Sequence, residues 1–199
     1  MKFEHLIIFG TVMVATWFVA LYFWPRVLLS VFKRAILVKG LGDGPIPVNT
    51  LYVQSERSFA DPVGATAGCP LATTGVNRDT LMSAGWLELR KGPQLLHVPD
   101  AGDRYYSVQL TDPSTNTNFA YVGTRTTGTQ AGDYLITGPK WTGPVPSGFT
   151  QISSPRNSVL VFGRVLVYAD SDLPLAHHLA KQIRISAPPD PSAFADTPP

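Results

Sequence analysis

The chain has 199 residues, of which 44% are hydrophobic and 15% are charged, and its formal net charge is +2. This length is enough for a domain with its own core, and a single cysteine, Cys69, excludes an internal disulfide. The charge is unevenly distributed, because residues 1–39 carry a net +4 and the remaining residues −2. The basic balance therefore belongs to the amino-terminal segment, where it suits anionic lipid headgroups, and no nucleic-acid partner is predicted.

Residues 6–24 are the most distinctive stretch, because they contain no charged side chain. A helix of this length, at roughly 1.5 Å per residue, just crosses a hydrocarbon core roughly 30 Å thick. Trp17, Tyr22 and Trp24 lie toward its far end, where an interfacial aromatic belt is expected. We therefore predict a single-pass membrane anchor. A cleaved signal peptide is the alternative, but its apolar region is usually roughly 7 to 15 residues long and no Ala-x-Ala-like cleavage site follows.

Residues 27–38 are apolar on all sides, with Lys33 and Arg34 in the middle. Two alternatives stay open for this stretch. It lies in the membrane interface with its basic side chains reaching the headgroups, or it continues the anchor helix past the membrane surface.

The basic residues also bear on orientation. More Lys and Arg residues follow the anchor than precede it, which by the positive-inside rule favours a cytoplasmic domain. The rule weakens for long domains, and a short tail followed by an anchor commonly tethers exported domains. We therefore predict that the soluble part is periplasmic or otherwise extracytoplasmic.

After the anchor and juxtamembrane segment (residues 1–39), we predict a Gly/Pro-rich spacer (40–70), a β-rich domain (71–186) and an extended Pro-rich tail (187–199). Short alternating runs between turn residues predict strands at residues 50–54, 86–90, 94–98, 104–111, 119–122, 134–137 and 158–168. Because no amphipathic helix separates them, we expect a mainly β fold, an antiparallel β-sandwich or barrel-like domain.

Residues 158–168 predict a central strand, because both of its faces are apolar. Gly163 allows a bend or bulge, and Arg164 is expected to pair with an Asp or to lie beside a polar cavity. Ser171-Asp172-Leu-Pro174 is typical of a helix start, and residues 175–185 are predicted to form one carboxy-terminal helix.

Two strand-flanking segments contain candidate ligand-binding residues. Asn77, Arg78 and Asp79 either form a turn at the start of the sheet or line a polar site. Tyr105 and Tyr106 point to opposite faces of a strand, so one ring should be buried and the other should face a groove or solvent. An exposed aromatic ring on a sheet can stack on a sugar.

The loop at residues 123–132 contains three glycines, four threonines and Arg125. The glycines permit close backbone approach, Thr126 and its neighbours supply hydroxyls, and the guanidinium offers a planar fork for a carboxylate or phosphate. The loop lacks the Lys and the strand-to-helix setting of a nucleotide P-loop. It is a ligand-binding loop or, alternatively, a long decorated hairpin.

The sequence shows no nucleophile elbow, zinc-helix motif or disulfide redox pair. Four histidines and one cysteine lack the spacing of zinc ligands, so neither a metal nor another cofactor is predicted. Several aspartates lie beside Gly or Pro, a setting more typical of turns than of acid–base catalysis: Asp79, Asp100, Asp103, Asp112 and Asp133.

A series of short motifs runs in unbroken order from Asn77 to about Leu179. These motifs are Asn77-Arg-Asp-Thr-Leu81, Gly92-Pro93, Val98-Pro-Asp100, Arg104-Tyr-Tyr106, Gln109-Leu110, Gly123-Thr-Arg-Thr-Thr-Gly128, Ala131-Gly-Asp133, Gly138-Pro139, Trp141-Thr-Gly143, Pro144-Val-Pro146 and Asp172-Leu-Pro174. Through them the sequence resembles the bacterial family called domain of unknown function 1254, which is often fused to or encoded beside domain of unknown function 1214. The resemblance implies a β-rich, exported or membrane-linked domain without a settled activity. Because the chain is short for this family, a companion chain of the second family is expected to complete any shared site.

Three functions follow as hypotheses. The first is a tethered β module that binds an envelope protein or a polymer such as a glycan through the face bearing Tyr105 and Arg125. The second is an accessory subunit of a larger membrane complex. The third is an enzyme acting on a carbohydrate or other polar polymer, in which Arg125 neutralises an anion and Tyr105 or an Asp carries a proton. The missing catalytic motifs favour the first.

Overall fold

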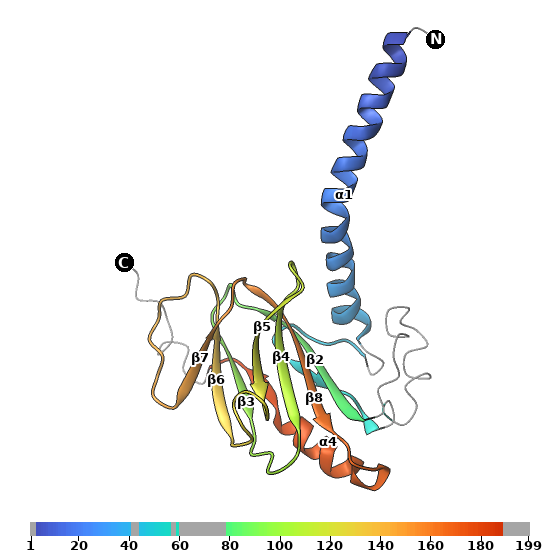
Figure 1. The fold of residues 1–199 in the computed structure, drawn as a ribbon. Helices are drawn as coiled ribbons and strands as arrows, with labels where there is room; N and C mark the ends of the chain where they lie inside the picture. The colour runs from blue at the N-terminus through green and yellow to red at the C-terminus, as the bar shows by residue number, and fades with distance from the viewer. Residues whose placement is uncertain (1–2, 41–43, 57–58, 60–78, 189–199) are drawn as a thin grey trace.

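The computed structural model describes residues 3–40, 44–56, 59 and 79–188, and joins one long helix to a two-sheet β domain (Figure 1). Helix α1 (Phe3–Lys39) begins the chain, and turn η1 (Asp170–Asp172) with helix α4 (Leu173–Gln182) precedes the last strand. The strands are β1 (Leu51–Val53), β2 (Thr80–Glu88), β3 (Gln94–Val98), β4 (Tyr106–Asp112), β5 (Thr117–Gly123), β6 (Gly132–Thr137), β7 (Phe149–Ser153), β8 (Ser158–Leu166) and β9 (Arg184–Ser186).

Five antiparallel strands form one sheet in the order β1-β2-β8-β4-β5, and four form the other in the order β7-β6-β3-β9. Among the strand pairs in the described residues, only β6–β7 is parallel. Side chains from both sheets and from α4 build a common core, which includes Leu87, Leu96, Val108, Ile136 and Ala176. Neither sheet closes on itself, so the fold is the sandwich of the two predicted alternatives rather than the barrel.

The predicted strands are present, but some boundaries and two further strands were missed. β2 begins at Thr80 rather than at residue 86, and β7 was not predicted because its sequence, FTQIS, has little apolar alternation. The predicted helix over residues 175–185 is wrong at its end. Ile183 adopts an extended conformation, and Arg184 and Ile185 form β9 on β3, which buries the Ile185 side chain. The predicted segment boundaries stay predictions, since residues 60–78 and 189–199 lie outside the described part.

Strand β8 lies between β2 and β4, as predicted for a central strand. Gly163 forms no bulge, because both ladders pass through it without a register shift. A Cβ at this position would lie 2.1 Å from Oγ of Ser83 on β2, so close packing is what requires glycine. The prediction for Arg164 is also wrong. Its side chain is exposed, because α1 covers the outer face of the sheet near Leu160 and Phe162 but not as far as Arg164.

Helix α1 is continuous, so residues 27–38 continue the helix that contains residues 6–24 and do not form a separate segment. Its carboxy-terminal part packs on the outer face of the five-stranded sheet through Leu29, Phe32 and Ile36. Ile36 is 3% exposed, and its partners include Trp86 on β2 and Leu160 on β8. This second apolar cluster attaches the helix to the domain.

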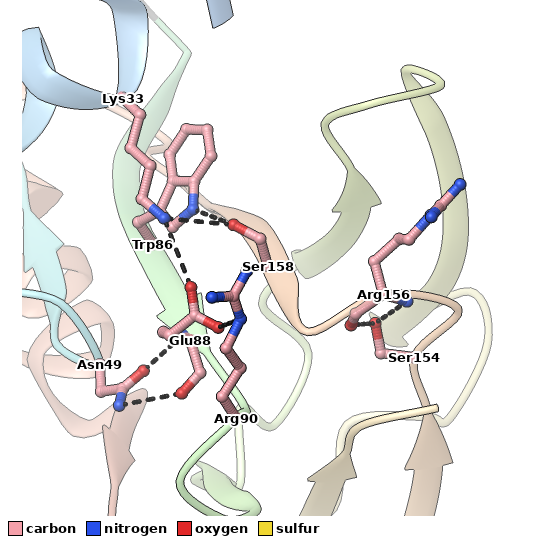
Figure 2. Close-up of polar contacts among 8 residues, drawn as sticks. All are labelled: Lys33, Asn49, Trp86, Glu88, Arg90, Ser154, Arg156 and Ser158. Atoms are coloured by element: carbon pink, nitrogen blue, oxygen red, sulfur yellow. Dashed lines mark hydrogen bonds and ion pairs between the residues drawn. The ribbon is translucent and has the colours of Figure 1, made fainter. Parts of the chain in front are cut away.

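Polar contacts fix the same part of α1 to the sheet (Figure 2). Lys33 Nζ lies 3.6 Å from Oε2 of Glu88 and donates to Oγ of Ser158 at 3.3 Å. Trp86 Nε1 donates to the same hydroxyl at 2.7 Å, and Lys33 Nζ lies 5.1 Å from the centre of the Trp86 ring. Asn49 Oδ1 accepts from the Glu88 amide at 2.8 Å. Because these partners come from α1, β2 and β8, the helix has one defined position on the sheet.

The amino-terminal part of α1 projects beyond the sheet (Figure 1). The large apolar side chains from Ile7 to Trp24 are each more than half exposed, among them Phe9, Trp17 and Phe18. The stretch Ile7–Lys39 is long and apolar enough, by length and composition, to cross a membrane.

Candidate functional site

The β domain has two ends along the direction of its strands. The end at which β2 finishes and β8 begins, with Glu88 paired to Ser158, lies next to the projecting part of α1; we name it the proximal end. The distal end is formed by residue 79 and the loops at residues 99–105, 124–131 and 167–172. All the predicted site residues within the described part lie at this distal end: Asp79, Tyr105, Arg125 and Thr126.

Two of these residues, Asp79 and Tyr105, lie on either side of the end of β8. The carbonyl oxygen of Asp79 accepts from the Val167 amide at 2.8 Å, and that of Tyr105 accepts from the Leu166 amide at 3.0 Å. The Arg125 guanidinium lies 5.3 Å from the centre of the Tyr105 ring, which is a cation–π contact. The predicted residues Asn77 and Arg78 lie outside the described residues.

One of the two adjacent tyrosines is buried and the other is accessible, as the alternation of side chains along a strand predicts. Tyr106 is 1% exposed and donates from its hydroxyl to the Gly128 carbonyl at 3.3 Å, whereas Tyr105 is half-buried. Burial raises the pKa of Tyr106. Tyr106 is therefore a core residue, and Tyr105 is the tyrosine that remains accessible.

The hydroxyls of the threonine-rich loop bond to its own backbone and to neighbouring strands. Thr126 Oγ1 donates to the Tyr121 carbonyl at 3.0 Å, and Thr127 Oγ1 accepts from the Gly123 amide at 3.0 Å. The loop connects β5 in one sheet to β6 in the other, so it is not a hairpin. The threonines thus stabilise the loop, while Arg125 stays exposed.

An ion pair that the sequence did not predict organises the distal end. Arg104 donates to Oδ2 of Asp172 from Nη1 at 2.5 Å and to Oδ1 from Nη2 at 2.6 Å, and the two side chains are 14% and 15% exposed. Asp172 Oδ2 also accepts from the Tyr168 amide at 3.0 Å. Hydrogen bonding from Arg104 lowers the pKa of Asp172, and the same pair raises the pKa of Arg104.

The Arg104–Asp172 pair is structural, because it ties the loop before β4 to the start of α4. Both residues lie in segments that carry the family resemblance, but they are 68 positions apart. No local spacing rule connects residues at that separation. Only the resemblance drew attention to both.

A cleft of about 420 Å³ lies elsewhere, between β1 and the segment that joins α4 to β9. Leu51 and Val53 line one side of it, and Lys181 and Arg184 supply cationic groups on the other. None of the predicted site residues that the structure describes lines this cleft. In the ranges that the structure describes, no three His, Cys, Asp or Glu side chains are grouped to hold a metal ion.

The sequence model of the family described as "Protein of unknown function (DUF1254)" matches residues 58–187. The chain belongs to this family. The match includes every described strand from β2 to β9, and the predicted resemblance is confirmed. No curated protein matches this DUF1254 chain.

Two solved structures are similar to it. The VPA0106 protein from Vibrio parahaemolyticus has a TM-score of 0.61 at 22% identity, covering 83% of this chain and 36% of its own. This similarity shows the fold, and the chain spans little more than a third of the Vibrio protein. An uncharacterized protein from Burkholderia cenocepacia has a TM-score of 0.36 at 12% identity over 60% of this chain and 31% of its own, which is too low for a comparison of folds.

Proposed function

We propose that this DUF1254 chain is a single-pass membrane protein that holds its β domain at the membrane surface. The supporting observation is the projecting part of α1, whose side chains from Ile7 to Trp24 are largely exposed. Soluble monomers rarely expose apolar patches larger than a few hundred Å². The rest of the same helix packs on the sheet, so the domain is attached to the anchor in a defined orientation.

Membrane extraction tests the anchor. The wild-type chain should stay with vesicles during a high-pH carbonate wash. Replacing Val14 and Phe18 with lysine should release it, because each lysine near the bilayer centre costs about 2.5 to 3.5 kcal/mol. The matched control, Thr117→Lys with Ser171→Lys, adds the same charge at exposed positions of the β domain and should stay bound. Release of the wild-type chain would contradict the proposal.

We place the β domain on the extracytoplasmic side, as an N-terminal anchor with a short tail is a common tether for exported domains. The basic residues after the span, Arg26, Lys33, Arg34 and Lys39, favour the opposite side by the positive-inside rule. Protease digestion of intact spheroplasts decides between the two sides. Digestion of the β domain supports this placement, and protection until lysis refutes it.

We further propose that the distal end binds a partner, either an envelope protein or a polar polymer such as a glycan. The supporting observation is the contact between exposed Arg125 and half-buried Tyr105, at the end opposite the projecting part of α1. An aromatic ring beside an Arg is a composition enriched at binding hot spots. With α1 in a membrane, this end faces the surrounding compartment.

Photo-cross-linking in intact membranes tests the distal site. A photoreactive phenylalanine analogue at exposed position Gln130 should give a discrete cross-linked species, and Arg125→Glu should lower its yield roughly tenfold or more, as at an Arg hot spot. Arg184→Glu is the matched control, because it makes the same charge change at an exposed position on β9, in the other sheet. No cross-link at position 130, or an equal loss in both variants, would refute the site.

A second candidate function is that of an accessory subunit of a larger membrane complex. In this proposal its partner is a companion chain of the domain of unknown function 1214 type. The enzymatic hypothesis stays a prediction. Unchanged turnover in the Arg125→Ala and Tyr105→Phe variants would refute it.

A further inference from the structure

Four loops at the proximal end, all within the described residues, carry positive charge only. These loops are residues 89–93, 113–116 and 154–157, together with the turn at 138–141 that directly follows β6. Their charged side chains are Arg90, Lys91, Lys140 and Arg156, and none of these described loops contains an Asp or Glu. All four are exposed, with 76% of the Arg90 side chain and 64% of the Arg156 side chain accessible.

Two carboxylates border these loops in the described part of the chain, and each is paired with a basic side chain. Glu88 is 28% exposed and lies between Lys33 and Arg90, with an oxygen–nitrogen distance of 3.3 Å to Arg90 Nε (Figure 2). Asp112 is 5% exposed and lies 3.8 Å from Arg156 Nε. The charge that reaches solvent at the proximal end is therefore positive.

The distal end has the opposite charge. Its loops, with residue 79, contain five aspartates, Asp79, Asp100, Asp103, Asp170 and Asp172, against Arg104 and Arg125. The pairing register of β2, β4 and β8 assigns the loops to the two ends. The fold therefore gives a nearly neutral sequence a domain with positive charge at one end of its strands and negative charge at the other.

The proximal end also faces the projecting part of α1. Lys33 contacts Glu88 at this end, and Trp24, the last residue of the apolar run, lies nine residues earlier, which is roughly 14 Å along a helix. The headgroup region of one leaflet occupies roughly 5–7 Å of this distance, and charges act over roughly 8–10 Å at physiological salt. The loops beyond Glu88 therefore lie within electrostatic reach of the headgroups.

We propose that the proximal loops form a docking surface for the anionic phospholipid headgroups of the membrane that α1 spans. This inference rests on the proposed anchor. Arg and Lys side chains near an anionic bilayer strengthen association. Together with the packed part of α1, this surface holds the strands end-on to the membrane and presents the acidic distal end to the compartment.

The test measures how close each end of the full-length protein lies to the lipid. In a Cys69→Ser background, a fluorophore is placed at Thr117→Cys on the proximal side or at Ser171→Cys on the distal side. The protein is reconstituted into vesicles of phosphatidylcholine alone or with phosphatidylglycerol, each carrying a headgroup-linked quencher in both leaflets. We expect quenching at position 117 to be at least twofold stronger in the anionic vesicles and to fall in high salt, with no change at position 171.

Charge reversal identifies the residues responsible. Lys91→Glu with Lys140→Glu should return quenching at position 117 to the phosphatidylcholine level, whereas Arg164→Glu with Arg184→Glu, the same charge change away from the proximal loops, should not. Equal quenching in both lipids, or an equal response of both variants, overturns the inference. Flotation of the same vesicles separates the two proposals: protein that fails to float refutes the anchor, and protein that floats without a lipid-dependent signal refutes only the docking surface.

Discussion

Trp86→Ala should lower the free energy of unfolding by about 3–5 kcal/mol, the usual cost of removing a large buried aromatic side chain. Trp86 is 1% exposed, its ring lies 6.4 Å from that of Phe32, and its indole nitrogen donates to Ser158. The cavity would open between α1 and the sheet. Chemical denaturation in mild detergent measures the loss, and hydrogen exchange at residues 29–37 should accelerate as the helix loosens.

Two variants show whether the effect belongs to this packing. Trp86→Phe keeps most of the volume but loses the hydrogen bond, so its loss should be smaller and close to about 1 kcal/mol. Trp17→Ala removes an indole that is 64% exposed and should leave denaturation of the β domain unchanged. A loss in Trp86→Ala below that of Trp86→Phe, or unchanged exchange at residues 29–37, would contradict the packing of α1 on the sheet.

Asp172→Asn should destabilise the domain by about 2–3 kcal/mol at neutral pH, between the values for exposed and for buried ion pairs. It leaves the Arg104 guanidinium, which is 14% exposed, without its carboxylate partner. Asp170→Asn, an exposed position in the same turn, is the matched control and should change stability by less than about 0.5 kcal/mol. Urea denaturation of the three proteins gives the differences.

The loss in Asp172→Asn should also depend on pH in a defined direction. Hydrogen bonding from Arg104 lowers the pKa of Asp172 in the folded state below its ordinary value of 3.8. The stabilisation by this ion pair is therefore fully present above pH 3.8, and it disappears as the pH falls through the lower pKa of the folded state. Wild type and Asp172→Asn should converge in acid, whereas a difference independent of pH would contradict the ion-pair explanation. Asp112, whose pKa is also lowered, is present in both proteins and cancels in the comparison.

Local patterns predicted much of the fold. Alternation in β3, β4 and β8 identified these strands, and it separated Tyr106 from Tyr105, because side-chain direction along a strand has a period of two. The same reasoning failed for Arg164 and for residues 184–185. In both cases the outcome depends on a distant element, the extent of α1 over the sheet for Arg164 and the pairing with β3 for Ile185.

The candidate site was predicted in part. Tyr105 and Arg125 were chosen separately from their chemistry, and their contact arises because β4 and β5 are neighbours in the sheet. Arg104 and Asp172 were not paired, because the strands β4 to β8 separate them along the chain and no spacing pattern links residues 68 positions apart. Thr126 was read as a donor for a ligand, but its hydroxyl bonds to the Tyr121 carbonyl within the same β5–β6 region.

The sequence by itself determined the uncharged apolar run, the strand-rich body and the family, because hydrophobicity and alternation are properties of neighbouring residues. Only the tertiary structure decided where charge gathers. Arg90, Lys91, Lys140 and Arg156 come from three separate loops, and the strand register together with the packing of Lys33 and Trp86 places those loops at the end from which α1 projects. Sheet order, rather than distance along the chain, sets which side chains share a surface, and a net charge of +2 gives no sign of it.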